Sequence, residues 1–151
     1  MQTTATFRLW GSAGLTAAAV TQRLGLQPTT ALESGTPVSR RSTRTRDSSL
    51  WLLSSSPGME SDVELATQLN RLLTVLEPVT HLLWDLVQTG YEANWFCYIA
   101  SHATEHAAEL DRPLLQRLLA LPGDLWLDVN GDDTDDEKRA PGTVDLTVFP
   151  A

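Results

Sequence analysis

The chain has 151 residues, and a hydrophobic fraction of 42% is enough to bury one continuous core without metal or disulfide staples. Its formal net charge of −8 argues against bulk nucleic acid as a partner, because the sequence-independent affinity of proteins for DNA or RNA comes from Lys and Arg neutralising phosphates. A single cysteine and the lack of a signal-peptide pattern predict a reducing cytoplasm. The lack of a run of about 20 apolar residues argues against a membrane partner. The length predicts one domain over residues 1–151.

The first third of the chain predicts a strand, a helix and two short strands. Residues 3–10 alternate apolar and polar side chains, which places one set on a core face. The helix that follows has Thr16 as its expected N-cap, and Gly25 ends it. Residues 29–32 fit a short edge strand. The apolar run 50–53 lies between serine-rich turns and fits a buried strand.

A long helix is expected to begin at Ser61 or Asp62 and to continue to about Val87. Pro78 should kink or divide it, because proline cannot donate the usual backbone hydrogen bond. The apolar arc of this helix spans about 200°, whereas about 100° covers one sheet face. We therefore expect burial on two sides, with pairing into a homodimer as one source of the second contact. Trp84, at the margin of the arc, is the candidate interface residue.

The last third predicts three strands and a helix. Residues 91–100 are rich in aromatic and β-branched side chains, as is typical of a central strand. Residues 125–129 fit a further strand, and residues 143–149 alternate like a closing hairpin strand. Asp111 can cap the helix between them. The expected buried stripe of that helix consists of Leu114, Leu115, Leu118 and Leu119.

These elements predict an α+β fold. We expect a mainly antiparallel sheet of about five strands with the helices on one face, related to ferredoxin-like arrangements. The apolar spacing that follows Leu15-Thr16 recurs after Leu110-Asp111. This repetition is compatible with two duplicated β-α units.

Three segments carry a resemblance to a known family: Leu-Gly-Leu-Gln-Pro-Thr at 24–29, the Trp-centred strand at 49–54 and Leu-Leu-Gln-Arg-Leu at 114–118. With the arginine-rich segment between the first two, they resemble domain-of-unknown-function family 4279, an uncharacterised bacterial family, over nearly the whole chain. The resemblance implies a compact α+β fold of this size and brings no activity, ligand or catalytic residue with it. Segments 102–109 and 132–137 depart from the expected pattern.

Charge is unevenly distributed along the sequence. Residues 1–50 carry six Arg against two acids, a balance of +4, whereas residues 51–151 carry five basic and seventeen acidic groups, a balance of −12. The Arg/Ser/Thr-rich segment 33–48 is the expected mobile loop, and 130–141 is the expected acidic turn. The guanidinium groups suited to an anionic partner belong to Arg40, Arg41, Arg44 and Arg46. The alternative is a solvated loop that lies against the acidic turn and neutralises it.

One segment matches a named catalytic motif. His102, Glu105 and His106 fit H-x-x-E-H, in which two His bind zinc and the Glu activates water. That chemistry needs a third protein ligand, yet the segment lies between a strand and a capped helix. A solvated turn is the competing interpretation, and we expect no catalytic residue, metal or cofactor. The acidic run 128–132 fails as a calcium loop, because Arg139 stands where a bidentate Glu belongs.

The leading functional hypothesis is a non-enzymatic interaction module. It would bind a protein or another anionic partner through the arginine loop and pair through the long helix. By analogy, a bacterial immunity or antitoxin-like role suits a small acidic protein of this kind. The alternative from a different class is a metal-dependent hydrolase that uses the His102-Glu105-His106 motif.

Overall fold

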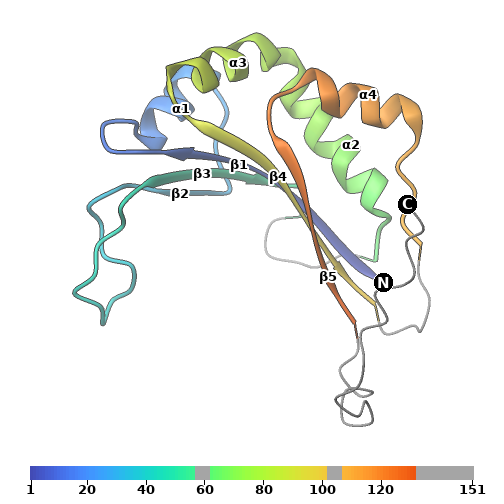
Figure 1. Ribbon diagram of the computed structural model, residues 1–151, viewed down its shortest axis with the longest axis horizontal. Helices are drawn as coiled ribbons and strands as arrows, with labels where there is room; N and C mark the ends of the chain where they lie inside the picture. The colour runs from blue at the N-terminus through green and yellow to red at the C-terminus, as the bar shows by residue number, and fades with distance from the viewer. Residues whose placement is uncertain (57–61, 102–106, 132–151) are drawn as a thin grey trace, which may run out of the picture.

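The computed structural model describes residues 1–56, 62–101 and 107–131, and its helices lie on one face of a five-stranded sheet (Figure 1). The α+β class and the mainly antiparallel sheet are confirmed. The elements are β1 (Gln2–Gly11), α1 (Ala17–Leu24), β2 (Thr30–Leu32), β3 (Ser49–Ser54), α2 (Leu65–Leu76), the 3-10 helix η1 (Glu77–Val79), α3 (Thr80–Thr89), β4 (Glu92–Ala100), α4 (Arg112–Ala120) and β5 (Asp124–Asn130).

The strand order is β2-β3-β1-β4-β5, so the first strand of the chain lies in the middle of the sheet. All pairings are antiparallel except β4 with β5, which are parallel and are connected through α4. The expected strand 143–149 lies outside the described residues. Within the described ranges, no helix is both long and apolar enough to span a membrane.

The core lies between the helices and the inner face of the sheet. Ala5, Phe7 and Leu9 are buried, as their alternation on β1 predicted. The ring of Phe7 packs against Trp95 of β4 with a centroid distance of 4.9 Å. Such a tilted aromatic pair combines a large buried area with favourable ring electrostatics. The middle of the sheet is therefore held on one side by a dense apolar layer.

The predicted long helix is divided into α2 and α3 by η1, which contains Pro78. Its first part begins at Leu65, three residues after Asp62. The margins of the wide apolar arc stay exposed, since Val75 and Trp84 are each 42% exposed. Its middle is buried, because α2 packs against both β1 and α4. Leu69, Leu72, Leu73 and Leu76 are all buried in this arrangement.

The expected stripe of α4 is half wrong. Leu114 and Leu118 are buried, whereas Leu115 is 45% exposed and Leu119 is 83% exposed. The reason is that α4 packs beside α2 and buries only a narrow stripe there. The start of the helix agrees with the prediction, because Asp111 accepts a 2.9 Å hydrogen bond from the Leu114 amide.

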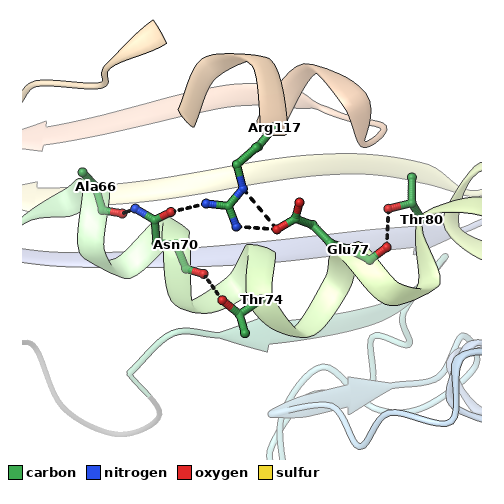
Figure 2. Close-up of polar contacts among 6 residues, drawn as sticks. All are labelled: Ala66, Asn70, Thr74, Glu77, Thr80 and Arg117. Atoms are coloured by element: carbon green, nitrogen blue, oxygen red, sulfur yellow. Dashed lines mark hydrogen bonds and ion pairs between the residues drawn. The ribbon is translucent and has the colours of Figure 1, made fainter. Parts of the chain in front are cut away.

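Polar contacts join α4 to α2 and to the first residue of η1 (Figure 2). The Arg117 Nε atom donates to Glu77 Oε1 at 3.1 Å, and the two terminal nitrogens of the guanidinium donate to Glu77 and to Asn70 Oδ1. The Asn70 amide is itself oriented by a 2.9 Å bond to the Ala66 carbonyl. The hydrogen bond from Arg117 lowers the pKa of Glu77.

Replacing Arg117 by methionine is expected to lower the free energy of unfolding by about 1 kcal/mol or less at neutral pH. Because the folded-state pKa of Glu77 is depressed, this stability is present above the ordinary carboxyl range and is lost as pH falls through the folded pKa. Urea unfolding of both proteins at pH 7 and at acidic pH should therefore converge at the acidic end. Arg23→Met, which removes the more exposed Arg23–Asp85 pair, is the control with a smaller expected loss. A constant difference at every pH would contradict the assignment.

Candidate functional site

All helices of the described residues lie on one face of the sheet, which leaves the other face free of them (Figure 1). The side chains of β1 and β4 that alternate away from the core point to this helix-free face. On β1, Arg8 pairs with Asn94 of β4 on one side and with Leu52 of β3 on the other. Directly opposed residues of neighbouring strands point to the same face. Arg8 therefore lies in the middle strand of this helix-free face.

Arg8 is held by contacts among which no described residue supplies an acidic partner. Its Nε atom donates a 2.8 Å hydrogen bond to Asn94 Oδ1, which fixes the plane of the guanidinium. Its Cζ atom lies 4.5 Å from the ring centroid of Phe96 and 5.7 Å from that of Trp10. Partial burial lowers the pKa of Arg8. The ion pairs among the described residues are Arg23–Asp85 and Arg117–Glu77, and neither involves Arg8.

The predicted arginine loop is a hydrogen-bonded turn next to this face. Arg46 donates its amide to the Thr36 carbonyl and accepts from the Gly35 amide, both at 2.8 Å, and Pro37 and Thr45 form an isolated bridge. Arg40, Arg41 and Arg44 are exposed, whereas Arg46 is half-buried. The expected contact with the acidic turn falls outside the described residues and stays a prediction.

Arg46 has a polar atom that no described residue satisfies. One terminal nitrogen donates to the Val38 carbonyl at 3.3 Å, but its Nε atom is buried without a partner in the part of the chain that the structure describes. Leaving a buried donor unpaired costs about 1–3 kcal/mol. A ligand oxygen at this position would remove that cost.

Two hollows meet at the indole of Trp10. One, of about 280 Å³, is lined by Arg44, Arg46 and Ser48 among others. The other, of about 390 Å³, is also lined by Trp10 and Ser48 and extends to Glu92 and Asn94. Asn94 accepts the hydrogen bond from Arg8, so Arg8 lies next to a residue that lines the second hollow.

A third hollow of about 400 Å³ continues from Asn94 to the start of β5. Two half-exposed tryptophans line it: Trp84 of α3 is 42% exposed and Trp126 of β5 is 59% exposed. The indole nitrogen of Trp84 donates a 2.9 Å bond to the Ala120 carbonyl, which fixes the ring at this margin. The interface role predicted for Trp84 is untested, but its position at a surface hollow is compatible with it.

The residues of the zinc hypothesis, His102, Glu105 and His106, lie outside the described residues. Among those described, no group of three His, Cys, Asp or Glu side chains is close enough to hold a metal ion. Cys97 is a buried thiol, and burial raises its pKa to about 12. A thiol with that pKa is protonated at neutral pH and is a poor nucleophile.

Sequence reasoning missed Arg8 and Asn94 as members of a site. The available signal was the alternation of β1, which places Arg8 and Trp10 on one outward face, and that of β4, which does the same for Asn94 and Phe96. Alternation within each strand does not specify the register between β1 and β4, and only that register brings Arg8 next to Asn94 and Phe96. Trp126 is exposed because it opposes Phe96 and therefore lies on the outward face of the sheet, away from the core.

The fold is thus an α+β layer with an open sheet face, and its sequence belongs to a family that shares no assigned activity. The family model described as a domain of unknown function, DUF4279, matches residues 1–132, so the chain belongs to that family. The match covers the segment 102–109 that departed from the expected pattern, and it ends at residue 132, the first residue of the other departing segment, 132–137. No curated protein and no solved structure matches the chain.

Proposed function

We propose that this chain is a non-enzymatic binding module whose helix-free sheet face binds an acidic segment of a protein partner. The observation that carries the proposal is Arg8, whose guanidinium lies between two aromatic rings and pairs with no described carboxylate. Keeping a partly buried cation without a counter-charge is costly, and an incoming carboxylate removes that cost. Arginine is suited to this task because its planar fork can bind both carboxylate oxygens.

The shape of the surface favours an extended segment over a small molecule. Small-molecule sites usually enclose most of their ligand. Here three hollows follow one another from the arginine loop to Trp126: the middle one shares Trp10 with the arginine-loop hollow and shares Asn94 with the hollow at Trp126. The cations at one end can bind carboxylates, and the aromatic rings can bind apolar side chains of the same segment. The exposed Arg40 and Arg41 would extend the contact beyond the sheet.

The overall charge sharpens the test of this proposal. A net charge of −8 repels an acidic ligand at long range, so binding must come from the local arginines. Fluorescent polyglutamate is therefore the probe, titrated by anisotropy at low salt. We expect wild-type binding that weakens as salt is added, and a loss of at least about ten-fold with Arg8→Gln. Replacing Arg40, Arg41, Arg44 and Arg46 together by serine should abolish it.

Arg23→Gln is the matched control, because it removes one positive charge from the helix-covered side, where Arg23 pairs with Asp85. It should bind polyglutamate like the wild type. Equal affinity of the Arg8→Gln and Arg23→Gln proteins would overturn the proposal. Polylysine serves as the probe of opposite charge, and its binding should not fall with Arg8→Gln.

An immunity or antitoxin-like role in a bacterial cytoplasm is the setting that we propose for such a module, since those proteins act by covering a partner's surface. The neighbouring genes would test this setting directly. The metal-dependent hydrolase alternative depends on His102, Glu105 and His106, and no contact among the described residues favours it.

A further inference from the structure

Among the described strands, β5 is the last and forms an edge of the sheet with a large apolar surface. It pairs with β4 on one side and is last in the strand order of the described residues. Three of its side chains are more than half exposed: Trp126 is 59% exposed, Leu127 is 55% exposed and Val129 is 65% exposed. Edge strands of monomers are usually short, covered or blocked, because their free backbone groups can pair with another strand.

The pairing with β4 assigns each side chain of β5 to a face. Leu125, Leu127 and Val129 oppose the buried residues of β4 and so point to the helix side. The residues between them point to the helix-free side. In a two-fold antiparallel pair of such edges, opposed residues must lie on the same face, so the centre of the pair falls on a residue.

The two carboxylates of β5 decide which residue can lie at the centre of such a β5–β5 pair. A pair centred on Trp126 would place Asp124 opposite Asp128 twice, and a pair centred on Asp128 would place that carboxylate opposite its own copy. Like charges directly opposed are destabilising. A pair centred on Leu127 avoids both conflicts, because Asp128 then lies opposite Trp126 and Asp124 lies opposite Asn130. It also uses all seven residues of β5 and places Leu125 opposite Val129.

We propose that β5 pairs antiparallel with β5 of a second copy of this chain, with Leu127 on the two-fold axis. The two sheets then form one continuous sheet. Because the axis is perpendicular to the sheet, both helix-free faces lie on the same side of the dimer. In this register the exposed apolar row of β5 faces its own copy and no carboxylate faces another, which is the reason for choosing a second copy as the occupant.

Cysteine cross-linking of the full chain tests this register. Leu127→Cys should form an intermolecular disulfide on mild oxidation, because opposed residues of antiparallel strands lie about 4.5–5.5 Å apart, within disulfide range. Trp126→Cys should not, since its two copies would be roughly 8 Å apart. Ala31→Cys, exposed on the opposite edge strand β2, is the control for random collision. The native Cys97 does not compete, because it is buried.

Light scattering supplies the independent measurement. The wild-type protein should have twice the chain mass of 16.6 kDa. Leu127→Lys and Leu127→Glu should each be mainly monomeric, and an equimolar mixture should regain the dimer, because Lys then faces Glu across the axis. A monomeric wild type without a Leu127→Cys cross-link would overturn the proposal and leave the edge to residues after Gly131 or to another protein. A dimer that cross-links through Trp126→Cys, or through neither β5 position, would overturn the register.

Discussion

Replacing Gly11 by alanine is expected to lower the free energy of unfolding by about 3 kcal/mol, the upper range for an overpacked interior. Gly11 ends β1, where the chain turns towards α1. A Cβ atom at this position would lie 2.6 Å from Ser49 Oγ and closer still to the Leu15 carbonyl oxygen. Neither neighbour can move freely, because the Ser49 hydroxyl donates to the Leu15 carbonyl and also to that of Gly11 at 3.3 Å.

The matched control is Gly131→Ala, since no atom of residues 1–56, 62–101 or 107–131 lies within 4 Å of an added Cβ there. Its free energy of unfolding should change by no more than about 0.5 kcal/mol. Urea titration followed by tryptophan fluorescence measures both variants. A Gly11→Ala protein as stable as Gly131→Ala would mean that the turn after β1 relaxes around the new methyl group.

Leu118→Ala is expected to cost about 2–3 kcal/mol, whereas Leu119→Ala should change stability by no more than about 0.5 kcal/mol. The two residues are adjacent on α4 and chemically identical, but Leu118 is 9% exposed and Leu119 is 83% exposed. Truncating the buried leucine removes contacts and leaves a cavity. Truncating the exposed one changes little, because alanine and leucine have similar helix propensities.

This pair of variants tests the rotation of α4 about its own axis. Thermal and urea unfolding at one protein concentration, with circular dichroism as the signal, are sufficient. Similar losses for both variants would show that the outer side of α4 is covered, and the exposed row of Leu115 and Leu119 would then have to be reassigned.

The α4 case shows why part of the fold was predictable and part was not. Caps are local: Thr16 accepts from the Ala19 amide, and Gly25 adopts a positive φ of 68° at the end of α1, so each could be recognised from a few neighbours. The division at Pro78 is equally local. The four leucines of α4 form two stripes, and their spacing is identical on both. Only the docking of α4 against α2 decides between them.

The candidate site was hidden for a related reason. The arginine loop stood out because its residues are close in sequence. Arg8, by contrast, acquires its partners from Asn94 and Phe96, which are distant along the chain and reach it only through the β1–β4 register. Register between strands depends on the whole sheet, and alternation within one strand does not specify it. The sequence therefore indicated the rim of the surface and missed its centre.

The strand order also has a consequence for how the chain folds. The middle strand, β1, is synthesised before the other strands, but its pairing with β4 cannot be completed until Ala100, the partner of Gln2, has been synthesised. Contacts between residues so far apart in sequence slow folding, because the entropy of closing the long loop is lost before the contacts form. During synthesis the nascent β1 is an unpaired apolar strand. Its neighbour β3, which follows at Ser49–Ser54, can cover only one of its edges until β4 has been synthesised.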